Sequence, residues 1–101
     1  MNYQLEKIIT KKILTWLNEQ PQCYFIKMHG SRFHSGRSDI IGCCRGIFVA
    51  IEVKRSPHDM PTPLQLNFLR KVRAAGGVGI VASDLKIVQQ AIKELEKKIG
   101  D

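Results

Sequence analysis

The 101-residue sequence contains no apolar stretch long enough to cross a lipid bilayer. Residues 1–17 carry charges throughout and lack the apolar centre of a secretory signal peptide. Repeats and low-complexity segments are absent as well. A chain of this length fits one compact domain, so we expect residues 1–101 to form a single domain that does not associate with membranes.

The cysteines show no pattern of a metal site or of a disulfide framework. Cys23, Cys43 and Cys44 form no Cys-x-x-Cys pair, which argues against zinc. Their number is odd and two are adjacent, so we expect reduced, buried thiols in a cytoplasmic protein. A clear Ser-His-Asp or Cys-His arrangement is also missing, which argues against acyl-transfer chemistry.

Acidic residues are few compared with basic ones. Sixteen Lys and Arg stand against nine Asp and Glu, and the formal net charge at pH 7 is +7. Such a field attracts polyanions and raises their encounter rate. Nucleic acid is therefore the first partner to consider, and a basic surface that only keeps the protein soluble is the alternative.

The hydrophobic pattern predicts alternating helices and strands. In residues 3–19, apolar side chains recur at helical spacing. Thr62, followed by Pro63 and Gln65, forms a capping-box pattern that opens a later helix. The expected elements are helix 3–19, strands 23–28, 39–44 and 47–54, helix 63–75, strand 78–82 and helix 84–99. This order, αβββαβα, predicts an α/β fold with a mixed β-sheet flanked by helices.

A tight turn at Arg45-Gly46 sets the expected register of the second and third strands, with Gly46 supplying a positive φ. In that register Asp39 pairs with Glu52, and cross-strand partners point to the same face with Cβ atoms roughly 5 Å apart. Lys54, two residues beyond Glu52, shares this face. The pattern therefore brings two carboxylates and an ammonium together at one end of a hairpin.

Two carboxylates this close need a proton, a cation or solvent between them. A hard divalent cation such as Mg²⁺ binds one or two carboxylates together with phosphate oxygens. It can then polarise a phosphate and help to generate hydroxide. The alternative is a solvent-facing Glu-Lys strand end with Asp39 capping a turn, and the combined pattern favours the metal site.

These residues resemble the motifs of the PD-(D/E)XK nuclease superfamily. The matching segments are Gly36-Arg37-Ser38-Asp39, then Ile51-Glu52-Val53-Lys54, and then Gln65. Within the superfamily the chain is most similar to VRR-NUC (virus-type replication-repair nuclease) domains of the stand-alone type found in phages and bacteria. The resemblance spans nearly the whole chain, because αβββαβα is also the order of that superfamily's restriction-endonuclease-like core.

The resemblance implies a Mg²⁺- or Mn²⁺-dependent endonuclease that acts on DNA and uses no small-molecule cofactor. Asp39, Glu52 and the main-chain carbonyl of Val53 would bind the metal, and Lys54 would be the catalytic lysine. It also implies a structure-selective enzyme that cuts branched, flapped or Holliday-junction-like DNA as a homodimer. The main alternative is a nuclease fold that binds DNA without cutting it, and an RNA-directed phosphodiesterase or a protein-interaction domain also stays open.

Some features of the family pattern have simpler explanations here. Ser38 stands where proline usually precedes the first acid. Gln65 matches the glutamine that faces the site in this group, or it serves only the capping box. Glu6 matches an acidic residue on the first helix that reaches the metal, although the helix dipole alone favours an acid there. Further basic residues near Asp39 are candidates to hold DNA phosphates or belong to a solvated loop: Lys27, Arg32, His34 and Arg37.

Overall fold

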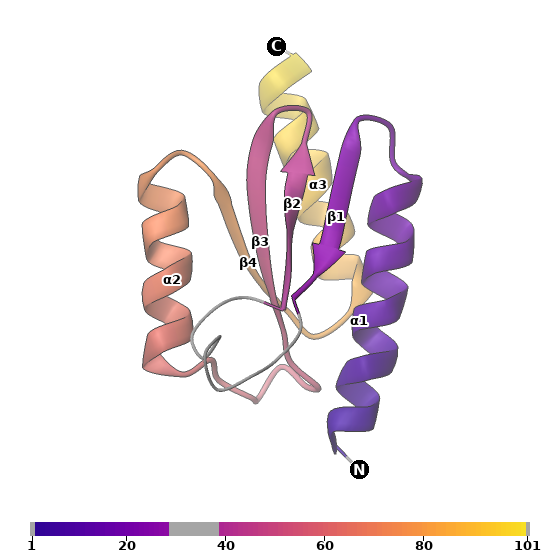
Figure 1. The fold of residues 1–101 in the computed structure, drawn as a ribbon, viewed down its shortest axis with the longest axis vertical. Helices are drawn as coiled ribbons and strands as arrows, with labels where there is room; N and C mark the ends of the chain where they lie inside the picture. The colour runs from indigo at the N-terminus through magenta and orange to yellow at the C-terminus, as the bar shows by residue number, and fades with distance from the viewer. Residues whose placement is uncertain (1, 29–38, 101) are drawn as a thin grey trace.

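The computed structural model describes residues 2–28 and 39–100, and within them the chain forms three helices and four strands (Figure 1). The observed order is αβββαβα, as predicted, and each end lies within one residue of its expected position. None of the described helices combines the length and the apolar character needed to cross a membrane. The elements are α1 Asn2–Glu19, β1 Cys23–Lys27, β2 Ile40–Cys44, β3 Ile47–Val53, α2 Pro63–Ala74, β4 Val78–Ala82 and α3 Leu85–Gly100.

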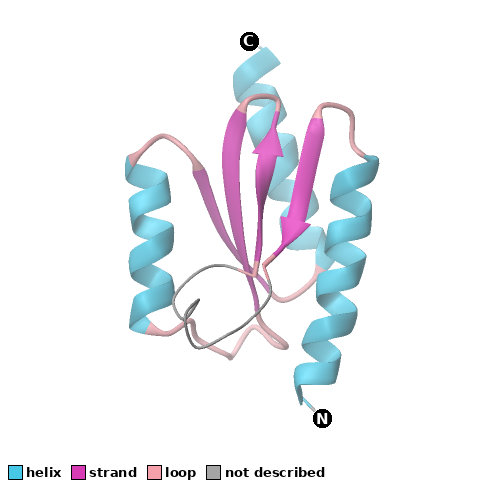
Figure 2. Ribbon diagram, in the orientation of Figure 1, coloured by secondary structure: helices cyan, strands magenta, loops and turns pink. Residues whose placement is uncertain are grey.

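The described strands form one mixed sheet in the order β1-β2-β3-β4. β1, β2 and β3 run antiparallel to one another, and β4 runs parallel to β3 because α2 connects them. α1 and α3 contact each other and cover one face, where the hydrophobic core lies. α2 packs on β3 and β4 from the opposite face (Figure 2).

The central strand β3 is buried on both faces. Val49, Ile51 and Val53 point into the core beneath α1 and α3, as their alternation predicts. Ala50 and Glu52 point the other way and are buried as well. A carboxylate on a strand that is covered on both sides loses its contact with water, and this burial determines the chemistry of the site.

The turn between β2 and β3 has the predicted position. Arg45 and Gly46 both adopt positive φ, 53° and 87°, which is the two-residue turn that matches the twist of a hairpin. The observed partners Cys44↔Ile47 and Cys43↔Phe48 confirm the expected register. The sequence pattern predicted a positive φ for Gly46 alone, whereas Arg45 adopts one too.

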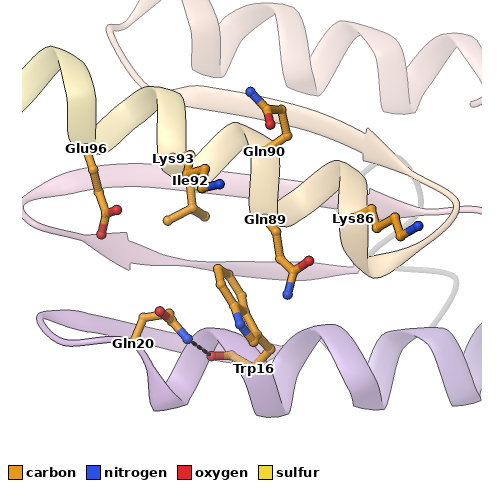
Figure 3. A pocket seen from close by; sticks show the side chains of 8 residues that line it. All are labelled: Trp16, Gln20, Lys86, Gln89, Gln90, Ile92, Lys93 and Glu96. Atoms are coloured by element: carbon orange, nitrogen blue, oxygen red, sulfur yellow. Dashed lines mark hydrogen bonds between the residues drawn. The ribbon is translucent and has the colours of Figure 1, made fainter.

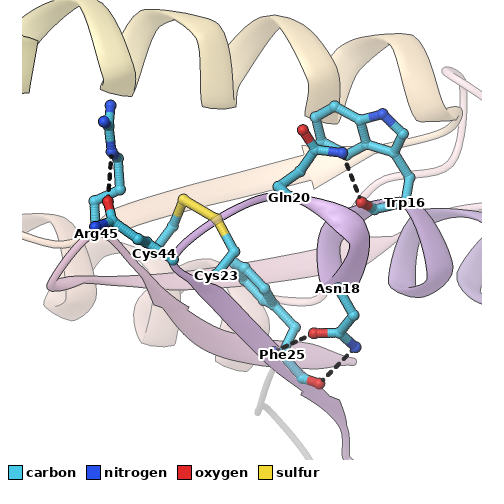
Figure 4. Close-up of a disulfide and its surroundings, with 8 residues drawn as sticks. Trp16, Asn18, Gln20, Cys23, Phe25, Cys44 and Arg45 are labelled. Atoms are coloured by element: carbon cyan, nitrogen blue, oxygen red, sulfur yellow. Dashed lines mark hydrogen bonds between the residues drawn. A yellow bond between two sulfur atoms is a disulfide. The ribbon is translucent and has the colours of Figure 1, made fainter.

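The expectation of three reduced, buried thiols is wrong. A disulfide joins Cys23 to Cys44 (Figure 4). Cys43 is free and exposed. Cys23 on β1 lies directly opposite Cys44 on β2, so the two side chains leave the sheet on the same face. Counting cysteines along the sequence misses this pair because the β1–β2 register brings it together.

The disulfide is expected to stabilise the fold. It closes a loop over a sequence separation of 21, for which loop-closure entropy predicts about 3 kcal/mol. Denaturant unfolding with and without reductant should therefore show a lower midpoint in the reduced protein. Cys43→Ser should unfold like the wild type, and equal midpoints in both conditions would show that the bond contributes nothing.

Candidate metal-binding active site

Asp39 is held between the ends of two other strands. It directly precedes β2, and its Oδ2 accepts a hydrogen bond of 2.8 Å from the main-chain N–H of Val53. Its own carbonyl accepts one of 2.7 Å from Met28, just beyond β1. The β2–β3 register ends at Ile40↔Ile51, one position short of Asp39, and the charge of Asp39 acts on the Glu52 carboxyl, so the two acids lie near each other.

Glu52 is the most deeply buried charged group of the site, with a relative exposure of 2%. Its Oε2 accepts a 2.7 Å hydrogen bond from Gln65 Nε2 and lies 3.3 Å from Lys54 Nζ. Its other oxygen, Oε1, is buried and has no hydrogen-bond partner among the described residues. A buried oxygen without a donor is costly, so this atom is suited to a ligand.

Lys54 shares the face of Glu52, as strand parity predicts. Its side chain is 14% exposed, so the ammonium lies at the border between the buried carboxylate and solvent. Lys54 Nζ contacts Gln65 Oε1 at 3.2 Å in addition to Glu52 Oε2. The two contacts restrict a long, flexible side chain to one part of the site.

Gln65 combines the two roles that the sequence left open. It completes the capping box of α2, in which Thr62 Oγ1 accepts from Gln65 N at 3.2 Å and Gln65 Oε1 accepts from Thr62 N at 2.8 Å. The same side chain also contacts Glu52 and Lys54. The capping pattern locates the residue, but only the packing of α2 on β3 shows that it faces the site.

Burial, and after it the nearby charge of Asp39, raise the pKa of Glu52 to about 8 against the opposing effect of Lys54. In the metal-free protein near neutral pH the Glu52 carboxyl is therefore largely protonated. The carboxylates of Asp39 and Glu52 repel each other when both are ionised, and protonation of Glu52 removes this repulsion when no cation is bound.

This pKa predicts a pH-dependent stability for the metal-free protein. The carboxyl has a pKa of 4.5 in its ordinary state and about 8 in the fold, so between these values the folded state binds more protons. The free energy of unfolding should fall as the pH rises from about 4.5 to about 8. Glu52→Gln should remove this dependence and be more stable than the wild type by about 1–3 kcal/mol near pH 8.

Denaturant unfolding near pH 5 and near pH 8, with a chelator present, measures this effect. Glu94→Gln, an exposed position on α3, is the matched control and should keep the wild-type dependence. An equal change in the free energy of unfolding between these pH values in Glu52→Gln and the wild type would show that another group titrates.

The residues of the site fit a hard divalent cation. Two carboxylates meet there, one oxygen lacks a donor, and the cost of ionising Glu52 falls when a cation is bound. The backbone of Val53 adjoins both acids. Among residues 2–28 and 39–100 no three His, Cys, Asp or Glu side chains gather at one point, so Glu6 does not join the pair directly. The N-terminal end of α1, which carries Glu6, lies at the site's end of the sheet (Figure 1).

The other predicted DNA contacts are only partly described. Lys27 is exposed at the end of β1 and pairs with Ile40, the neighbour of Asp39. Arg32, His34 and Arg37 lie outside the described residues. Because Ile40 in turn pairs with Ile51, Lys27 lies on the face of the sheet opposite to Glu52, and the structure does not bring its side chain to the two acids.

A hollow elsewhere in the structure is separate from this chemistry. It lies between α1 and α3, on the face of the sheet opposite Glu52, and Trp16 and Gln20 form its α1 side (Figure 3). Gln20 Nε2 donates to the carbonyl of Trp16 at 2.9 Å. The lining mixes amides, charges and one indole without a pair of carboxylates, so the candidate active site stays with Asp39 and Glu52.

Comparison with solved structures identifies the fold. One similar structure, a VRR-NUC domain protein, superimposes with a TM-score of 0.71 at 19% identity, covering 91% of this chain and 88% of the other. The chain has the fold of a VRR-NUC domain. A second, described as a VRR-NUC domain, gives a TM-score of 0.63 at 22% identity, with 91% and 94% covered. No family model and no curated protein matches the sequence.

These similarities confirm the predicted restriction-endonuclease-like architecture. Both VRR-NUC structures align over about nine-tenths of the chain, so the likeness covers the sheet and the helices on both faces. The positions of Asp39, Glu52 and Lys54 on adjoining strand ends rest on this chain's own contacts.

Proposed function

We propose that the protein is a Mg²⁺- or Mn²⁺-dependent endonuclease that hydrolyses phosphodiester bonds in DNA. One observation carries the proposal: Glu52 is buried beside Asp39 with an unpartnered oxygen, and Lys54 adjoins its other oxygen. This arrangement costs stability in the metal-free protein. The VRR-NUC fold and the net charge of +7 support the same conclusion.

Each residue of the site has a distinct task in this proposal. Asp39 and Glu52, with the main-chain carbonyl of Val53, would hold the cation, which supplies Lewis-acid activation of phosphate and water when bound. Lys54 orients the attacking water or neutralises charge that develops on the scissile phosphate. Gln65 keeps the Lys54 ammonium beside Glu52.

The proposed substrate is branched DNA, such as a flap or a four-way junction. Resolving a junction requires cuts in two strands, and one copy of this domain supplies one such site. We therefore propose a homodimer that presents two sites related by a two-fold axis. Lys27, exposed at the end of β1 that lies nearest Asp39 along the sheet, would contact a phosphate of the bound DNA away from the metal.

Cleavage assays test this function directly. The purified protein is incubated with duplex, single-stranded, flap and four-way-junction DNA in Mg²⁺, Mn²⁺ or EDTA, and its mass is measured by sedimentation. We expect metal-dependent cleavage of the branched substrates by a dimer. Binding without cleavage in every condition would replace the enzyme with a DNA-binding module, and cleavage of all substrates alike would refute structure selectivity.

A further inference from the structure

We infer that Thr62 is a positioning residue, whose main-chain N–H sets the orientation of the Gln65 amide between Glu52 and Lys54. Only its predicted effect on kcat rests on the proposed function. Gln65 Oε1 is 2.8 Å from Thr62 N and 3.2 Å from Lys54 Nζ. Both partners are donors only, so the amide oxygen must face them.

The orientation of the oxygen determines the orientation of the nitrogen. With Oε1 turned to Thr62 and Lys54, Gln65 Nε2 faces Glu52 Oε2 at 2.7 Å and donates to it. A reversed amide would oppose its NH₂ group to two donors and its oxygen to the Glu52 carboxyl. The reversal would set donor against donor at both Thr62 and Lys54, so the N–H of Thr62 determines which way round the amide lies.

The local sequence leaves this task to Thr62. Pro61 and Pro63 have no N–H, so Thr62 provides the one main-chain donor of residues 61–63. Its backbone is extended, with φ −70° and ψ 162°, and in this conformation its N–H donates to Gln65 Oε1.

The choice of glutamine over glutamate at this position supports a role beyond capping. Either residue completes a capping box, and glutamate would also suit the helix dipole. The first turn of α2 nevertheless holds no acidic residue. A glutamate could accept from Thr62 and Lys54, but it could not donate to Glu52, which is what the amide does here.

Three variants at position 62 separate the N–H from the hydroxyl. Thr62→Ser keeps both groups, Thr62→Ala keeps only the N–H, and Thr62→Pro removes both at a φ that proline adopts. The readout that needs no activity is the Gln65 side-chain NH₂ signal in ¹⁵N NMR spectra, assigned by its loss in Gln65→Glu. We expect an exchange-protected signal in the wild type, Thr62→Ser and Thr62→Ala, and loss of protection in Thr62→Pro.

Kinetics on the cleaved substrate complete the test. Thr62→Pro should lower kcat about tenfold or more with little change in KM, while Thr62→Ala should lower the melting temperature and keep kcat near that of the wild type. A protected amide signal or an unchanged kcat in Thr62→Pro would overturn the inference. If the wild type cleaves nothing, the NMR result still decides the positioning role separately from the proposed function.

If Thr62→Pro does not fold, Gln65→Glu tests whether the Gln65 amide has a positioning role. It preserves the capping box, so we expect it to fold, to lose the donor to Glu52 and to cleave about tenfold or more slowly. A folded Gln65→Glu protein with wild-type kcat would show that the amide has no positioning role.

Discussion

Replacing Lys54 with alanine should lower kcat by about 10²–10⁴-fold while metal and DNA affinity stay close to those of the wild type. The position of the Lys54 ammonium explains this expectation. Lys54 Nζ lies 3.3 Å from Glu52 Oε2 and 3.2 Å from Gln65 Oε1, and a lysine does not coordinate a cation. Removing it takes away water orientation or charge neutralisation during hydrolysis and leaves both acids in place.

Arg55→Ala is the matched control for this prediction. Arg55 is the next basic residue along the chain and pairs with Asp59 at 3.2 Å, outside the site. The control should cleave at nearly the wild-type rate. Single-turnover cleavage and a metal titration measure the two properties, and a Lys54→Ala protein that no longer binds metal would contradict the assigned role.

Removing either acid should abolish both metal binding and cleavage. Asp39→Asn and Glu52→Gln keep the size of the side chain and remove one of the two charges that attract the cation. A metal that binds the folded state at a hundredfold excess over its Kd stabilises it by about 2.7 kcal/mol, or about 13 °C in melting temperature for a chain of this size. We expect this increase with Mn²⁺ in the wild type and little or none in the two variants.

Thermal melts with Mn²⁺ and with EDTA measure this effect without DNA. Glu94→Gln should retain the full increase, because its side chain is exposed on α3 and contacts Gln90 rather than the site. An equal increase in Glu52→Gln and the wild type would place the cation elsewhere. Because Glu52→Gln also removes a buried ionisable group, its melting temperature in EDTA near pH 8 should exceed that of the wild type.

The local elements follow from the sequence because their causes are local. Helical periodicity, the Arg45-Gly46 turn and the capping box around Thr62 each depend on residues a few positions apart. The turn alone determines the β2–β3 register, and strand parity then places Asp39, Glu52 and Lys54 on one face. For this reason the central trio of the candidate site could be predicted without coordinates.

Only the tertiary structure decided the features that join distant segments. The β1–β2 register paired Cys23 with Cys44, and no local sequence pattern predicts that contact. The docking of α2 on β3 buried Glu52, left one of its oxygens without a donor and raised its pKa to about 8. The same docking turned Gln65 from a capping residue into a partner of Glu52 and Lys54. Sequence spacing determines which side chains share a face, whereas burial and hydrogen bonding depend on what packs against that face.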